Sequence, residues 1–132
     1  MAIIIPPDFA DLLTYEKKAY AHLALVLTDG TPHVSPVWFE WDGEHIVVNT
    51  ARGRVKDKIL SRHPNVAVCI TDPADPERYM QLRGRVVVET EDGAWEKICD
   101  LSEKYRGHRN FKRVPGQVRV TYKILPERVY AE

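Results

Sequence analysis

The stretch 31–63 restricts the possible folds more than any other part of the chain. Its first segment, 34–40, carries Val34, Pro36, Trp38 and Glu40 on one face if it is extended, because side chains alternate along a strand. Asp42-Gly43 then supplies the residue types of a two-residue hairpin turn. A second strand over 45–50 and a basic helix over 55–62 follow. The pattern predicts a strand, a hairpin, a second strand and a short helix in direct succession.

The remaining chain adds more strands and two helices at its periphery. Asp8 is a suitable N-cap for a short helix to about Lys18, and Gly107 is a suitable end for a longer one. Gly84, inside an apolar run, indicates a bulge or a close backbone approach. The expected strands cover 22–28, 65–72, 78–90 and 117–129, and the longer helix covers 91–106. We therefore expect one domain over 1–132, mainly β, built as an antiparallel barrel of six or so strands with peripheral helices.

Charge and hydropathy exclude several classes of partner. The formal net charge is zero, so the chain lacks the electrostatic signature of a nucleic-acid-binding protein. No segment reaches the ~18 apolar residues of a membrane helix, and the N-terminus does not resemble a signal peptide. We expect a cytoplasmic protein that binds a small-molecule substrate, without nucleic acid or membrane.

Basic residues nevertheless gather where the second strand of the hairpin meets the helix. Arg54, Lys56 and Lys58 lie near the start of the helix, directly after the short side chains of 49–51. Helix N-termini and basic side chains together favour an anion such as a phosphate. The alternative is a solvated amphipathic helix whose lysines only keep the protein soluble.

Aromatic residues in the hairpin suggest a shelf for a ring-shaped ligand. Trp38, Phe39 and Trp41 place an aromatic side chain on each face of the strand, and Pro36, which lacks an N–H group, suits an edge or a bulge. The alternative is that one tryptophan belongs to the core and another to a dimer interface.

Catalytic motifs are absent from the sequence. The histidines form no pair at metal-ligand spacing, the cysteines are far apart, and no nucleophile or nucleotide-binding motif is present, so we predict no metal and name no catalytic residue. An enzyme with this composition must take its reactivity from an organic cofactor.

These motifs together resemble a known superfamily. The run 29–68, with PVW and NTARGRVK, and the later RGRV of 83–86 are similar to the pyridoxamine-phosphate-oxidase-like split β-barrel proteins. Within that superfamily the chain resembles the small oxidoreductases that use the deazaflavin coenzyme F420. The resemblance implies a six-stranded split β-barrel that forms a homodimer with its sites at the interface.

The resemblance also implies a set of cofactor-binding residues. One segment would lie along the tricyclic ring, a second would meet its polar edge or phosphoribityl chain, a basic group would bind the phosphate, and one residue would come from the second subunit. The ring segment corresponds to Ser35, Pro36, Val37 and Trp38, and the second segment to Asn49, Thr50 and Ala51. Lys56 would bind the phosphate with the help of Arg54 and Lys58, Val55 between them is a further cofactor-binding position, and the residue from the second subunit is Tyr79.

Three functions remain open from the sequence. The first is an F420H2-dependent reductase that transfers a hydride to a small conjugated substrate, such as an enone, an imine or a tetrapyrrole. The second is an FMN-dependent oxidoreductase of the pyridoxamine-phosphate-oxidase kind, although FMN-binding relatives usually carry an arginine in the segment 34–38, where this chain has none. The third is a non-catalytic module that binds a flavin or haem.

Overall fold

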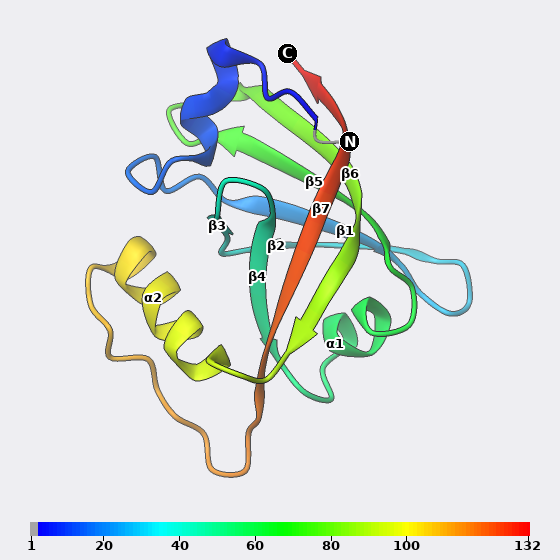
Figure 1. Ribbon diagram of the computed structural model, residues 1–132, viewed down its shortest axis with the longest axis vertical. Coiled ribbons are helices and arrows are strands. Elements are labelled where there is room, and N and C mark those ends of the chain that lie inside the picture. The colour runs from blue at the N-terminus through cyan, green and yellow to red at the C-terminus, as the bar shows by residue number, and fades with distance from the viewer. Residues whose placement is uncertain (1–2) are drawn as a thin grey trace.

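The computed structural model describes residues 3–132 and contains one antiparallel sheet of seven strands (Figure 1). The strand order is β2-β1-β5-β6-β7-β4-β3, so β2 and β3 form the two edges. The strands are β1 (Ala21–Val26), β2 (Pro32–Val37), β3 (Glu40–Trp41), β4 (Ile46–Ala51), β5 (Asn65–Asp72), β6 (Asp75–Thr90) and β7 (Arg119–Ala131). The sheet is strongly curled, so its two edges approach each other and the whole forms a half-barrel. This architecture confirms the expected mainly β fold.

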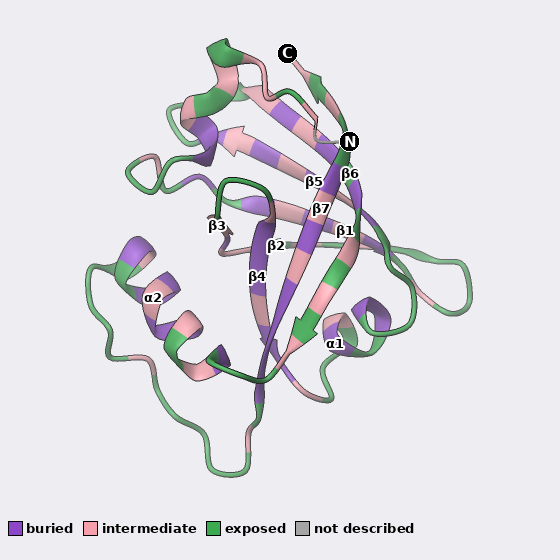
Figure 2. Ribbon diagram, viewed as in Figure 1, coloured by how far each residue is buried: buried purple, intermediate pink, exposed green. Residues whose placement is uncertain are grey.

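The hydrophobic core fills the inside of the curled sheet. Leu23, Phe39, Ile70, Met80 and Tyr122 are almost completely buried there. Figure 2 shows that buried positions run along β4 and β7, whereas the β1–β2 turn and the segment after α2 are exposed. The core therefore makes β4 and β7 a rigid support for residues at their ends.

The strand count differs from the expected six because the first strand of the hairpin is interrupted. Pairing stops at Val37 and resumes at Glu40, so one expected strand becomes β2 and β3. The turn is also longer than expected: Trp41 pairs with Ile46, which leaves a four-residue loop over 42–45. The Asp42 carboxylate accepts hydrogen bonds from the backbone N–H groups of Glu44 and His45, at 2.9 and 2.6 Å, and closes that loop.

Three short helical elements cover the sheet. The N-terminal one, η1 (Pro7–Leu13), is a 3-10 helix without a side-chain cap, so the predictions of an Asp8 cap and of a helix to Lys18 were wrong. Its position is fixed instead by Arg78, which donates to the Asp11 carboxylate at 2.6 Å. The other two are α1 (Val55–Leu60) and α2 (Ala94–Arg106), and α2 ends at Gly107 in the left-handed conformation, as predicted.

Gly84 lies where β6 and β7 come unusually close. A Cβ atom there would lie 2.8 Å from the Leu125 carbonyl carbon and closer still to its oxygen, and the strand register shifts at this point. Only glycine fits, which confirms the predicted close approach.

Within residues 3–132, no helix is both long and apolar enough to cross a membrane. The same residues contain no group of three histidine, cysteine or acidic side chains arranged to hold a metal ion.

Candidate functional site

The loop between β4 and α1 is held by a network around Asp57. The Asp57 carboxylate accepts hydrogen bonds from the Tyr122 hydroxyl at 2.6 Å, the Gly53 N–H at 2.8 Å and the Arg52 guanidinium at 3.0 Å. Burial alone would raise the pKa of Asp57, but these hydrogen bonds outweigh it and keep the pKa below its usual value. Arg52 also pairs with Glu89 and Glu91. The loop is therefore rigid, and its first arginine is fully neutralised.

Arg54 and Lys56, in the same loop and the following turn, have no such partners. Among the ion pairs of residues 3–132, none involves either side chain. Lys56 is half-buried, and its Nζ donates to Ser35 Oγ at 3.4 Å. Burial, and secondarily the charge of Arg54, lower the pKa of Lys56. An anion bound here would oppose both effects on the pKa of Lys56, because it stabilises the charged form of the lysine.

These two cations border a cavity of about 230 Å³ between β2 and the part of β4 that extends beyond β3. Strand β2 contributes one wall and β4 the opposite one, while α2 closes the bottom with Ile98 and Leu101. The lining consists of Tyr20, Pro36, Val37, Trp38, Asn49, Thr50, Arg54, Lys56, Ile98, Leu101 and Phe111. The cavity thus combines an apolar and aromatic interior with a basic rim, which is typical of a small-molecule site.

Backbone groups are also free along this cavity. Strand β4 pairs with β7 over Ile46–Ala51, but with β3 only at its first two residues. Within residues 3–132 the opposite edge of 48–51 has no strand partner, and apart from the Ala51 carbonyl, which accepts from the Arg54 N–H at 3.3 Å, its backbone groups are left for a ligand. In addition, the buried Thr50 hydroxyl has no hydrogen-bond partner among residues 3–132, a rare condition for a buried polar group.

Asn49 lines the cavity, and its side chain is bonded within the chain. Its amide nitrogen donates to the Ala94 carbonyl at 2.8 Å and to Thr121 Oγ1 at 3.2 Å, and its oxygen accepts from Arg119 Nε at 2.9 Å. The side chain therefore ties β4 to the start of α2 and orients Arg119.

Trp38 lies at the interruption between β2 and β3, and its ring is held from the side of α2. The Tyr105 ring stacks on it with centroids 5.4 Å apart, and the Arg106 guanidinium lies 4.8 Å from its centre. The neighbouring Phe39 carbonyl accepts a hydrogen bond from the buried Lys104 at 2.7 Å. Helix α2 thereby fixes an aromatic wall of the cavity.

Not all the predicted residues meet at this cavity. Ser35 reaches it through Lys56, and Ala51 is buried at the end of β4. Val55 and Lys58 line a separate cavity with Leu27 and Arg62. Tyr79 lies on β6, where its hydroxyl donates to Glu132; within one chain it takes no part in the site.

The sequence interpretation missed the residues that α2, β7 and the connector 107–118 contribute. Ile98, Leu101 and Phe111 line the cavity, and Arg119 is bonded to Asn49 behind it. Arg119 carried one signal: it is a charged residue between two valines of an alternating strand.

Comparison with known proteins agrees with this architecture. The pyridoxamine 5'-phosphate oxidase family matches residues 7–131. A solved F420 reductase is 32% identical, with a TM-score of 0.83 over 96% of this chain and 98% of the other. A comparison with curated proteins finds no match.

More distant structures share the fold. HupZ of Group A Streptococcus is 18% identical, with a TM-score of 0.67 over 97% of this chain and 94% of the other. General stress protein 26 of Bacillus anthracis is 21% identical, with a TM-score of 0.64 over 92% and 91%. Because the family match extends over nearly the whole sequence, the chain belongs to the pyridoxamine 5'-phosphate oxidase family.

Proposed function

We propose that the protein is an F420H2-dependent reductase that binds the deazaflavin in the cavity between β2 and β4. The observation that carries this proposal is the basic rim of Arg54 and Lys56, free of carboxylates within residues 3–132, on a cavity walled by Trp38. The 32% identity to an F420 reductase over almost the full length supports the choice of coenzyme.

The residues present suit a phosphate-bearing ring cofactor. Lys56 and Arg54 would hold the phosphate with charge-assisted hydrogen bonds. The free edge of β4 at 48–51 and the Thr50 hydroxyl would bond the polar groups of the ring or its side chain. Pro36 and Val37 would lie along the ring face, where the missing N–H group of Pro36 leaves no donor to desolvate.

When bound, the reduced deazaflavin would supply a hydride for an electron-poor double bond. The protein would orient the two reactants and exclude water, since positioning alone can account for a large part of a rate enhancement. Trp38, fixed by Tyr105, and Phe111 would form the apolar walls. No proton-donating residue is assigned.

The proposed assembly is a homodimer. The outer face of β6 and β7 carries a cavity of about 590 Å³ lined by Gln81, Arg83, Arg128, Val129 and Tyr130. The Tyr79 ring lies 6.3 Å from that of Tyr130, between ring centroids. A second copy would cover this face and place Tyr79 at its partner's cofactor. Sedimentation as a monomer would contradict this part of the proposal, and the cytoplasmic location stays a prediction.

FMN in the same cavity is the second candidate. The family to which the chain belongs favours it, whereas the segment 34–38 lacks the arginine expected of an FMN site. The non-catalytic flavin- or haem-binding module is the third, and turnover with reduced deazaflavin would exclude it.

The decisive experiment is a parallel fluorescence titration of the protein with F420 and with FMN. We expect saturable F420 binding, weaker FMN binding, and a loss of about 10- to 100-fold in F420 affinity for Lys56→Ala, because one charge-assisted bond is removed. Lys58→Ala is the matched control: the same change on the same helix, but at a separate cavity, with a much smaller expected loss. Equal losses for both variants, or binding of neither cofactor, would refute the assignment.

A further inference from the structure

Arg119 on β7 is a buried guanidinium without a negative partner. Its residue is only 7% exposed. Nε donates to Asn49 Oδ1 at 2.9 Å and Nη1 to Gln117 Oε1 at 3.3 Å, while the ring of Phe111 lies 5.2 Å from the guanidinium carbon. No carboxylate of residues 3–132 pairs with it. Neutral contacts thus orient the group and leave its charge uncompensated, a costly arrangement for a buried cation.

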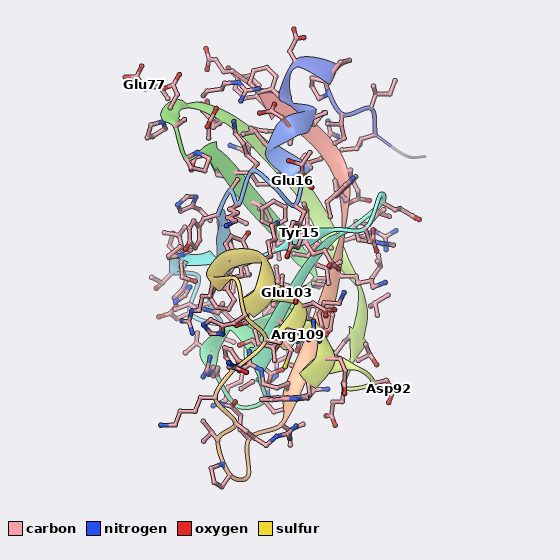
Figure 3. The ribbon with its side chains drawn as sticks, turned by 90° about the vertical axis from the view of Figure 1, so that its left-hand side faces the viewer. Tyr15, Glu16, Glu77, Asp92, Glu103 and Arg109 are labelled. Atoms are coloured by element: carbon pink, nitrogen blue, oxygen red, sulfur yellow. The ribbon has the colours of Figure 1, made fainter. Side chains whose placement is uncertain are left out.

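A second cavity, of about 240 Å³, is lined in part by Arg119. It lies between the start of α2 and the connector 107–118 and is lined by Glu91, Trp95, Arg113, Val114, Gln117, Val118 and Arg119. Figure 3 views the molecule from the side of this connector, whose beginning is marked by Arg109. Arg113 stacks on the Trp95 ring, with its guanidinium carbon 3.8 Å from the ring centre. The cavity therefore carries two arginines, one buried and one on the rim.

The charge of this cavity favours a single negative group. Glu91, the one acidic residue in the lining, is bonded to Arg52 Nε at 2.9 Å, but Arg52 also pairs with Asp57 and Glu89, so the charge of Glu91 is only partly compensated. The two arginines of the lining nevertheless outweigh this single carboxylate. Burial, together with the nearby charge of Arg54, lowers the pKa of Arg119 to about 10. A planar carboxylate matches the fork of an arginine, and Glu91 nearby would disfavour a dianion such as phosphate.

This cavity adjoins the proposed cofactor cavity. Phe111 lines the cofactor cavity, and its ring lies 6.1 Å from Trp95 and in contact with Arg119 on the other side. Phe111 and the Asn49–Arg119 pair thus form a shared wall. A molecule held by Arg119 would have its remaining atoms at the edge of the cofactor cavity.

We propose that the cavity around Arg119 and Arg113 is a carboxylate subsite that binds the acid group of an anionic substrate beside the cofactor. The inference rests on the proposed function for the identity of the second reactant, but binding of a carboxylate to the subsite does not require any cofactor. It narrows the substrate class from conjugated acceptors in general to conjugated acids.

The test is benzoate binding to the cofactor-free protein, followed by NMR of the arginine Nε–H and tryptophan indole signals. We expect benzoate to shift the Arg119 and Trp95 signals saturably, and benzamide, its neutral analogue, not to do so. Arg119→Gln should weaken benzoate binding by about tenfold or more, because a charged donor is lost. Arg109→Gln is the matched control: it also replaces an arginine by glutamine, but Arg109 lies in the connector outside the cavity lining and is bonded to Asp100.

Arg113→Gln provides a second test that does not depend on the buried position. Arg113 is exposed, so its replacement should leave the fold intact and weaken benzoate binding by about threefold. Absence of benzoate binding, equal binding of benzamide, or unchanged affinity in both arginine variants would overturn the proposal.

The source of the carboxylate is tested separately. Benzoate that is displaced by F420, but not by a deazaflavin lacking the acidic side chain, would assign the cavity to the cofactor and overturn the substrate proposal. Failure of the cofactor titration with retained benzoate binding would instead refute the proposed function and leave the subsite in place.

Discussion

Arg52 and Arg54 lie two residues apart in one loop and have opposite surroundings. Arg52 bonds Asp57, Glu89 and Glu91, so its charge is compensated within the chain. Arg54 has no ion pair with residues 3–132 and instead borders the cavity together with Lys56. Arg52 holds the loop in place, and the loop positions Arg54 at the rim of the cavity. Two arginines that are alike in the sequence thus differ in their partners, and the sequence pattern does not reveal this difference.

Of the substitutions that test the contrast between Arg52 and Arg54, the one with the largest expected effect replaces Asp57, the carboxylate that holds Arg52. We expect Asp57→Asn to lower the free energy of unfolding by about 3 kcal/mol. The amide has one acceptor oxygen where the carboxylate has two, so its NH2 group must face a donor that Asp57 now satisfies, and the charge opposite Arg52 is lost. Cofactor affinity should fall as well, since Asp57 also fixes the Gly53 N–H next to Arg54. Denaturant unfolding and the F420 titration measure the two effects.

The pH dependence of the same variant has a defined sign. The pKa of Asp57 is held below its usual 3.8, so its stabilisation is present above that pH and is lost as the pH falls through the lowered value. The gap between wild type and variant should therefore narrow only in acid. Asp92→Asn is the control, the same change at an exposed position. A similar loss in the control would contradict the role given to Asp57.

Lys104 is a useful comparison for Arg54. It also lacks an ion pair with residues 3–132, but it does not border the proposed cofactor cavity. It is buried, donates to the Phe39 carbonyl, and lies over the rings of Phe39 and Tyr105. Burial lowers its pKa to about 8, and the charges of Glu40 and Glu16 oppose this shift only weakly. Its partners are thus complete within the chain, unlike those of Arg54.

We expect the unfolding free energy of the wild type, relative to Lys104→Met, to rise by about 2 kcal/mol from pH 7 to pH 10. The folded state releases its proton near pH 8 and the unfolded state near 10.5, so stability increases across this interval. Lys97→Met is the control on the same helix. The bond of Lys97 to Glu40 outweighs burial and raises the pKa of Lys97. The difference in unfolding free energy between wild type and Lys97→Met should therefore stay constant up to about pH 10. A flat profile for both variants would show that Lys104 is not desolvated.

Periodicity in the sequence predicted most of the sheet, and the exceptions have tertiary causes. The strand Asn65–Asp72 and the end of α2 at Gly107 were placed correctly, because alternation and a terminating glycine are local signals. The interruption at Phe39 was missed because its backbone groups bond to Tyr105 and Lys104, 65 or more residues further along the chain. No local pattern in the hairpin carries that information.

The candidate site shows the same limit. Residues of the loop and hairpin, such as Trp38, Thr50 and Lys56, were predicted together and lie around one cavity, since they are close in sequence. Arg119 and Phe111 come from distant segments and were missed. Lys58 was assigned to the site by its charge and by the family resemblance, but in the structure it lines the cavity that it shares with Leu27 and Arg62. Residue types indicate the kind of ligand, whereas the position of each lysine around the helix determines which cavity it lines.

The smallest expected effect on stability, and the most direct test of the contrast, is Arg54→Gln. Because Arg54 lacks ion pairs with residues 3–132, we expect the unfolding free energy to change by no more than about 0.5 kcal/mol. The pKa of Lys56 should rise toward its ordinary value, since the charge of Arg54 is one of the two causes that lower it. NMR titration of the Lys56 amine measures this rise, and the F420 titration should show weaker binding despite unchanged stability. Arg52→Gln is the matched comparison and should show the reverse, a clear loss of stability. If Arg54→Gln destabilised the protein as much as Arg52→Gln, both arginines would be structural, and the basic rim would lose its meaning as an anion site.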